Sequence, residues 1–127
     1  MKQRLPRFLI ILAALLTIRA ANALDIYNDN GGMAIAYAVK FERASKPIRV
    51  FGNCASACTL ALKYPSTCAG PRASFAFHAA THPRITRWMM GQYPKAIRAW
   101  IQRHGGLTGR MIVLRGREME KIVGRCE

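Results

Sequence analysis

Ser56 lies in a segment whose residue types suit a nucleophile. Residues 48–51 before it are β-branched and aromatic, whereas residues 60–63 after it have an apolar helical pattern. The alanines on both sides leave the hydroxyl accessible, and a helix N-terminus favours negative charge that develops nearby. The sequence therefore predicts that Ser56 could attack a carbonyl carbon, with the N–H of Ala57 directed at the resulting oxyanion.

His78 ends a second predicted strand, residues 74–78, and could serve as the base that a serine nucleophile needs. Each residue also has an ordinary structural explanation. A serine at a strand-to-helix junction is commonly an N-cap, and a single histidine is commonly a packed or surface residue. Because Ser56 and His78 lie on either side of one predicted helix, the sequence supports the catalytic and the structural interpretations about equally.

Strands and helices alternate in the first half of the sequence, which predicts parallel strands joined by right-handed crossovers. We expect strands at residues 24–29, 48–52, 67–70 and 74–78, and helices at 32–42 and 56–63. Residues 79–93 show little periodicity and are predicted to form a loop. The remaining predicted helical segments are residues 94–104, 109–114 and 118–123.

Two apolar groups in the second half could have either a core or an interface role. Trp88, Met89 and Met90 could be core residues, a lip facing the substrate, or a contact for a second subunit. Ile97, Trp100 and Ile101 form one stripe of the helix predicted at 94–104, and this stripe could pack in the core or against another subunit.

The order of three motifs resembles a known family. An Asn28-Asp29-Asn30-Gly31-Gly32 turn is followed by Gly52-Asn53-Cys54-Ala55-Ser56-Ala57-Cys58 and then by Phe75-Ala76-Phe77-His78. This pattern is similar to the proteolytic subunit of Clp protease and to the wider ClpP/crotonase-like superfamily, above all to its small secreted bacterial members. The resemblance implies an α/β domain with a truncated ClpP/crotonase-like fold, in which helices flank a short, mostly parallel sheet.

The resemblance also implies roles for individual residues. Ser56 matches the nucleophile and His78 the general base, while Gly31, Gly32 and Ala57 match the oxyanion hole. Two departures stand out: Asn30 replaces the family's proline, and no acid lies between Glu42 and Glu118. Three explanations remain open for the missing acid. The site could be a Ser–His dyad, a backbone carbonyl or a late glutamate could replace the acid, or the protein could have lost its activity.

Residues 1–23 have the pattern of a secretory signal peptide, namely a basic start, an apolar stretch and Ala-Asn-Ala before the expected cleavage site. An uncleaved N-terminal anchor is the alternative. Cleavage would leave residues 24–127 as a single domain, without stable membrane insertion, in the periplasm or outside the cell. The formal net charge of +14 attracts anions, but the basic residues are scattered and no nucleic-acid motif accompanies them. We therefore expect no nucleic-acid partner.

The four cysteines, Cys54, Cys58, Cys68 and Cys126, favour disulfides in an exported domain. The sequence does not decide among three pairings. We prefer Cys58 with Cys68 and Cys54 with Cys126. A zinc site formed by Cys54, Cys58, His78 and His82 is the competing interpretation, which the unusual spacing and the predicted export disfavour. We therefore expect neither a metal nor a cofactor.

Two functions are compatible with these patterns. The first is an exported serine hydrolase of the peptidase type, acting on a peptide or a small acyl substrate. The second is a catalytically inactive module of the cell envelope that binds peptides or partners in the same groove, with main-chain hydrogen bonds to a strand edge. The protein could also form a homo-oligomer, because the sheet of a truncated domain could be completed by another chain.

Overall fold

The computed structural model describes residues 23–44 and 47–127. Residues 1–22 of the predicted signal segment, residues 1–23, lie outside this part, as do Ser45 and Lys46. Among the described residues, no helix combines the length and the apolar character that are needed to cross a membrane.

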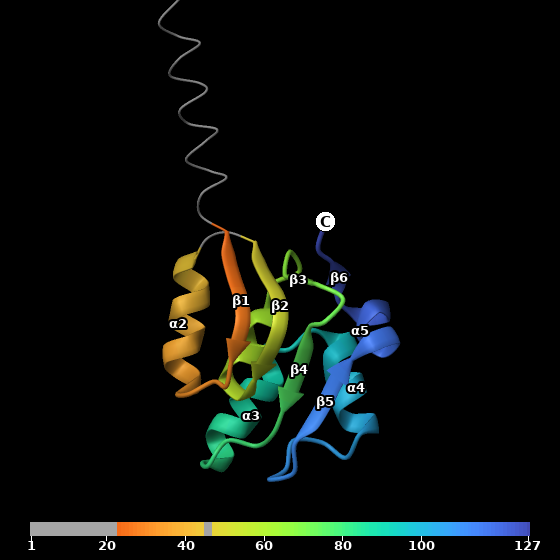
Figure 1. Ribbon diagram of the computed structural model, residues 1–127. Coiled ribbons are helices and arrows are strands. Elements are labelled where there is room, and N and C mark those ends of the chain that lie inside the picture. The colour runs from red at the N-terminus through yellow and green to blue at the C-terminus, as the bar shows by residue number, and fades with distance from the viewer. Residues whose placement is uncertain (1–22, 45–46) are drawn as a thin grey trace, which may run out of the picture.

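A six-stranded sheet organises the described chain (Figure 1). The central strand β2 (Ile48–Ala55) is flanked on one side by β1 (Leu24–Asp29). On its other side it pairs with β3 (Cys68–Ala69) near its start and with β4 (Ser74–Phe77) near its end. All three pairings are parallel, as the alternation of strands and helices predicts.

The far part of the sheet differs from the prediction. Residues predicted as a helix at 109–114 instead contribute to strand β5 (Ile112–Arg115), which runs antiparallel to β4. A short last strand, β6 (Gly124–Arg125), pairs with β3. The sheet is therefore mixed, which corrects the expectation of a mostly parallel sheet. The alternation Ile112-Val113-Leu114 has the period of two of a half-buried strand, since Leu114 is buried and Val113 is exposed.

Figure 1 shows helix α2 (Ala34–Ala44) beside β1, and helices α3 (Pro83–Gln92) and α4 (Lys95–Arg103) behind the strands. The 3₁₀ helix η1 (Ser56–Lys63) follows β2 directly, and α5 (Gly116–Ile122) follows β5. Helix α4 (Lys95–Arg103) confirms the helix predicted at 94–104. Its apolar stripe is buried in this chain, and Trp100 packs against Phe77 of β4 with ring centroids 5.7 Å apart.

The prediction of a loop at residues 79–93 is wrong for most of that range, because α3 spans Pro83–Gln92. Proline at the first helical position and His82 as the N-cap start this helix, since the Nδ1 atom of His82 accepts a hydrogen bond from Arg84 N–H. Met89 on its inner face is 3% exposed. Basic residues interrupt the apolar spacing of α3, so its periodicity is weak in the sequence although its start signals are present.

Two disulfides join Cys54 to Cys58 and Cys68 to Cys126. The even cysteine count therefore predicted the number of bridges, but the preferred pairing was wrong. The reason is strand β6, which the sequence analysis missed. It places Cys126 beside β3, where the Cys126 N–H donates a 3.0 Å hydrogen bond to the Ala69 carbonyl oxygen. Cys68 consequently forms its bridge with Cys126, and Cys54 forms its bridge with Cys58, four residues further along the chain.

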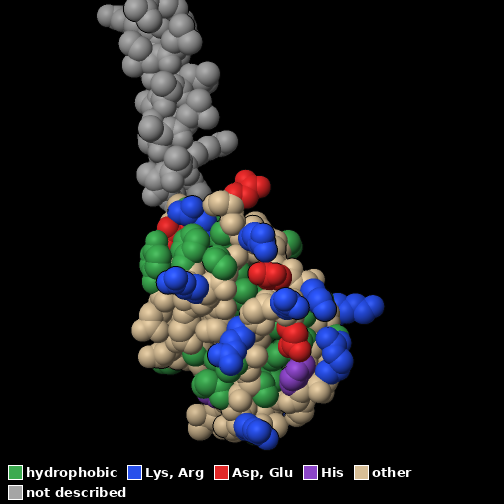
Figure 2. Space-filling model, turned by 45° about the vertical axis from the view of Figure 1, so that its right-hand side comes forward, with side chains coloured by type: hydrophobic (Ala, Val, Ile, Leu, Met, Phe, Trp, Pro, Cys, Tyr) green, Lys and Arg blue, Asp and Glu red, His purple; other side chains and the backbone are tan. Residues whose placement is uncertain are grey.

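Basic side chains are spread over the face that carries β5 and α5, with acidic groups between them (Figure 2). In α5 (Gly116–Ile122), Glu120 lies 3.4 Å from the Arg125 guanidinium.

Candidate functional site

Ser56 occupies a sharp turn between β2 and η1. Ala55 before it is extended (φ −114°, ψ 154°), whereas Ser56 has φ +56°. Among the described residues, Ser56 is the one non-glycine residue with a positive φ. A residue with a Cβ is strained in this left-handed region, and such strain is concentrated at functional sites. A strained serine between a strand and a helix is the geometry of a nucleophile elbow, which exposes the hydroxyl group.

The glycine turn lies directly against this elbow. A Cβ atom on Gly31 would be 2.5 Å from the Ala55 carbonyl oxygen and 2.8 Å from the Ser56 Cβ, so that only glycine fits. Gly31 also has φ +81°, and its N–H donates a hydrogen bond to Asp29. The N–H of Gly31 is therefore engaged. Of the predicted oxyanion-hole residues, Gly32 and Ala57 are those that line the pocket beside Ser56.

His78 follows the last residue of β4, and the strand register places it near the elbow. Ala55 of β2 is paired with Ala76 of the neighbouring parallel strand, so both chains leave the sheet at the same edge. The carboxyl ends of parallel strands are a common location for ligand sites in α/β proteins. Ser56 and His78, which are far apart in the sequence, therefore face the same space.

A backbone carbonyl holds the histidine ring. The Nδ1 atom of His78 lies 2.7 Å from the Ala79 carbonyl oxygen, which can only accept a hydrogen bond. Nδ1 therefore carries the proton, and Nε2 is left free to act as a base. The Ala79 N–H in turn donates to the Thr108 carbonyl oxygen at 2.7 Å, which anchors this loop. Of the replacements considered for the missing acid, the structure thus contains the backbone carbonyl.

Several acidic side chains of the described residues have partners other than His78. Glu118, the late glutamate, accepts a 2.7 Å hydrogen bond from the Trp100 indole N–H. Asp25 binds Arg49, and Glu42 accepts a hydrogen bond from Tyr64. Within the described residues, no carboxylate forms an ion pair with His78.

Four of the predicted residues, Gly32, Ser56, Ala57 and His78, line one pocket of about 360 Å³. The glycine turn, the elbow, the His78 loop and α3 each contribute to its walls. Most of its surface is apolar, and the acidic residues of the described chain are absent from its lining. The lining residues are Gly32, Met33, Ala34, Ile35, Ser56, Ala57, His78, Ala79, Ala80, Thr81, His82, Ile85 and Met89.

The zinc interpretation is not compatible with this arrangement. Cys54 and Cys58 are bonded to each other, so neither is available as a thiolate ligand. His82 caps helix α3 through its Nδ1 atom. In the described part of the chain, no group of three or more histidine, cysteine, aspartate or glutamate residues is arranged to bind a metal ion.

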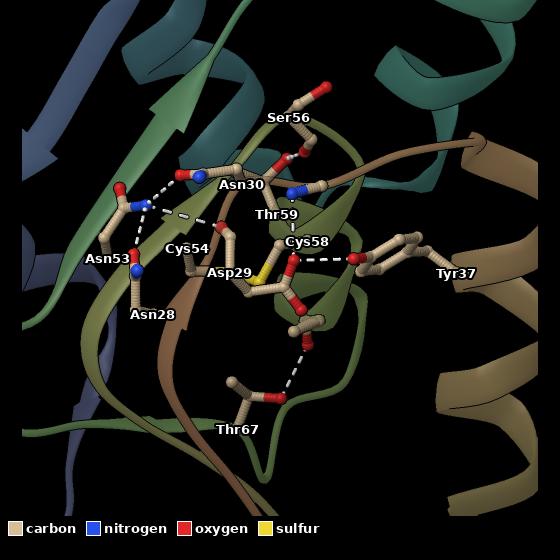
Figure 3. Close-up of a disulfide and its surroundings, with 12 residues drawn as sticks. Asn28, Asp29, Asn30, Tyr37, Asn53, Cys54, Ser56, Cys58, Thr59 and Thr67 are labelled. Atoms are coloured by element: carbon tan, nitrogen blue, oxygen red, sulfur yellow. Dashed lines mark hydrogen bonds between the residues drawn. A yellow bond between two sulfur atoms is a disulfide. The ribbon is translucent and has the colours of Figure 1, made fainter.

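Asp29 supports the glycine turn, a role that the sequence analysis missed. Its Oδ1 atom accepts hydrogen bonds from Gly31 N–H at 2.8 Å and from the Tyr37 hydroxyl at 2.6 Å, the latter drawn in Figure 3. The bond to Asp29 raises the pKa of Tyr37 to about 12. An aspartate two residues before a glycine is the signature of an Asx-turn, so this signal was present in the sequence.

Asn53 at the end of β2 binds the same turn from the other side. Its side-chain nitrogen donates to the side-chain oxygens of Asn28 and Asn30, at 3.2 Å and 3.0 Å (Figure 3). These bonds connect the end of β1 to the strand that carries the elbow. Asn30 thus contributes a side-chain acceptor.

Two linked hydrogen bonds, made by Thr59 and Tyr93, support the backbone of the elbow. The Thr59 hydroxyl donates to the Ser56 carbonyl oxygen at 2.6 Å, and the Tyr93 hydroxyl lies 2.6 Å from Thr59 Oγ1. Since the single Thr59 proton is used for Ser56, the Tyr93 hydroxyl is the donor to Thr59. Burial raises the pKa of Tyr93 to about 12, which keeps this donor protonated at ordinary pH.

Comparisons with known proteins found similarity to solved structures. No family model matches the sequence, and no curated protein matches it. Among solved structures, the chain is similar to a mutant of ClpP1 from Listeria monocytogenes, with 14% identity and a TM-score of 0.38. The alignment covers 89% of this chain and 93% of that one.

Proposed function

We propose that this protein is an exported serine hydrolase that uses Ser56 as the nucleophile and His78 as the general base. One observation carries the proposal: the single strained non-glycine residue of the described chain is a serine that shares a pocket with a histidine whose Nε2 is free. Strain at a backbone position is retained where it serves a purpose, and here it presents the hydroxyl to the pocket.

The proposed reaction follows from these positions. Nε2 of His78 takes the proton of the Ser56 hydroxyl as Oγ attacks the substrate carbonyl carbon. The N–H groups of Gly32 and Ala57 stabilise the negative charge on the carbonyl oxygen. The bond to the leaving group then breaks, and the protonated His78 donates its proton to that group. Water, deprotonated by His78, then attacks the acyl carbon of the acyl-enzyme. The bond between that carbon and Oγ breaks, and His78 returns the proton to Oγ, which releases the acid and restores Ser56.

Substrates of this site would be peptides or small acyl compounds. The pocket walls formed by Met33, Ile35, Ile85 and Met89 suit an apolar group of the substrate. The reaction needs no metal ion or organic cofactor, because nucleophile, base and oxyanion donors are all protein groups.

Labelling with a fluorophosphonate probe tests this proposal, since the probe phosphonylates activated serines. Wild-type protein should be labelled on Ser56, and Ser56→Ala should not be labelled. His78→Ala should slow labelling by about 10² to 10⁴-fold, the usual contribution of a general base. Ser66→Ala removes an exposed serine outside the pocket and serves as the matched control. Equal labelling of wild-type protein and Ser56→Ala would disprove the role of Ser56.

The second candidate is an inactive module that binds a peptide in the same pocket. The lack of a carboxylate at His78 favours it, because loss of such an orienting group can cost orders of magnitude in rate. It predicts an unlabelled wild-type protein that nevertheless binds peptides. Ile85→Lys, which places a charge at the pocket wall, should then abolish peptide binding.

Export is part of the proposal, because disulfides persist in oxidising compartments. Two bridges and the signal-like pattern of residues 1–23 support it. N-terminal sequencing of the protein from the cell envelope should begin at Leu24. An intact N-terminus in the membrane fraction would instead support the uncleaved anchor.

A further inference from the structure

We infer that the Cys54–Cys58 disulfide is a positioning device for the nucleophile, which holds Ser56 in the left-handed conformation that the proposed reaction requires. This inference rests on the proposed function and adds to it a requirement for one particular bridge. Cys54 and Cys58 do not touch the substrate; they act through the backbone of Ser56.

The bridge enforces the turn by its span. The Cα atoms of Cys54 and Cys58 are 5.2 Å apart, although the residues are separated by four positions. Four residues of an extended strand would cover about 13 Å. The chain must therefore abandon the strand conformation inside the bridged segment, and Ser56 is its central residue. Ser56, with φ +56°, lies at the point where the chain changes from the strand to the helix.

The elbow is held from two sides. Both cysteines are 0% exposed and belong to the hydrophobic core, so the bridge fastens the elbow from within. On the opposite side the Gly31 backbone lies against Ala55 and Ser56 so closely that a Cβ would clash. Figure 3 shows the disulfide beside the Asp29 and Asn53 contacts that fasten the glycine turn. Removal of the bridge would release the elbow on the side that faces the hydrophobic core.

The second bridge provides a natural contrast. Cys68 and Cys126 are separated by 58 positions, whereas Cys54 and Cys58 are separated by four. A bridge that closes a long loop restrains the unfolded chain much more than one that closes a short loop. Cys68–Cys126 should therefore matter more for global stability. The short bridge restrains little of the unfolded chain, and its main effect is on the local geometry of Ser56.

Two double variants separate these effects. Cys54→Ala/Cys58→Ala and Cys68→Ala/Cys126→Ala are compared by fluorophosphonate labelling rate, corrected for the folded fraction, and by melting temperature. We expect the first variant to label about a hundredfold more slowly, the cost of misplacing a reacting group, with the smaller drop in melting temperature. The second should label as fast as wild type per folded molecule and show the larger drop. Equal labelling rates in the two variants would overturn the inference.

Reduction of the wild-type protein gives an independent measurement if the first variant does not fold. Each bridge takes two electrons and two protons from dithiothreitol, which closes to its cyclic disulfide. Iodoacetamide traps the new thiols, and mass spectrometry identifies the opened bridge. Loss of labelling should accompany opening of Cys54–Cys58 in molecules that circular dichroism reports as folded. Full labelling with that bridge open would refute the inference.

A structural measurement distinguishes failure of this inference from failure of the proposed function. If wild-type Ser56 does not react with the probe, the hydrolase proposal fails, but the bridge can still be tested. A crystal structure of Cys54→Ala/Cys58→Ala, or of the reduced protein, reports the backbone of Ser56 directly. We expect φ to leave the left-handed region. An unchanged Ser56 conformation without the bridge would contradict the positioning role, whatever the activity.

Discussion

The carboxylate of Asp29 accepts a 2.8 Å hydrogen bond from the backbone N–H of Gly31. This bond fastens the glycine turn above Ser56 and takes the Gly31 N–H out of the set of free oxyanion donors. Asp29 therefore orients the backbone of the glycine turn, whereas the Ala79 carbonyl orients His78.

Loss of this acceptor should weaken the oxyanion hole. We expect Asp29→Ala to lower kcat, or the rate of probe labelling, by roughly tenfold to a hundredfold, which is less than the loss of an oxyanion donor itself. Asp29→Asn keeps an oxygen acceptor for Gly31 and should recover most of the rate with an unchanged KM. Asp25→Ala on the same strand removes a carboxylate that binds Arg49, and it is the matched control. A rate for Asp29→Ala equal to that of Asp25→Ala would show that Asp29 has no such role.

Gly31 should tolerate no side chain. Gly31→Ala places a Cβ 2.5 Å from the Ala55 carbonyl oxygen at a positive φ, and we expect at least about 2 kcal/mol of lost stability together with lost labelling. A Cβ added at Gly91 in α3 would meet nothing within 4 Å beyond the backbone of its own helix. Gly91→Ala should therefore raise the unfolding free energy by about 0.5–1 kcal/mol. Urea denaturation of both variants measures the difference, and comparable effects would contradict the close contact at Gly31.

The buried pair of Thr59 and Tyr93 should respond asymmetrically to substitution. Tyr93→Phe removes one donor but leaves the Thr59 bond to Ser56 intact, so we expect a loss of about 1 kcal/mol. Thr59→Val, of similar volume, removes the Ser56 bond and leaves the Tyr93 hydroxyl buried without its partner. Its cost should be larger, about 2–3 kcal/mol. Urea titrations check the order, and a larger loss in Tyr93→Phe would invalidate the assigned direction of the hydrogen bonds.

Alkaline pH should destabilise the protein through its tyrosines. Tyr37, Tyr64 and Tyr93 have pKa values raised to about 12, Tyr37 mainly by its bond to Asp29 and the other two mainly by burial. A raised folded-state pKa contributes stability below pH 10 that is lost as the pH rises from 10 to about 12. Melting temperatures should fall across this range. In an absorbance titration at the phenolate band, one tyrosine of the Asp29→Ala variant should ionise at a lower pH than in the wild-type protein. An unchanged titration curve would argue against the Asp29–Tyr37 hydrogen bond.

Local sequence signals indicated several residues that line the pocket beside Ser56. Small residues around Ser56, the glycine pair and the strand before His78 suggested an elbow, a close backbone approach and a base, and Gly32, Ser56, Ala57 and His78 line one pocket. The strands and helices up to β4 also lie near their predicted positions. Such signals are local, because hydrophobic periodicity and turn residues act over a few positions of the chain.

The tertiary structure decided what depends on partners distant in the sequence. Pairing of β3 with β6 determines which cysteine meets Cys68, and no local pattern specifies that register. The orientation of His78 comes from a carbonyl, which every residue possesses and which therefore leaves no mark in the sequence. Ser56, whose φ is positive, likewise has contacts with Thr59 and Gly31 that exist only in the folded chain. Residue types determined which groups could react, and folding determined which of them are held together.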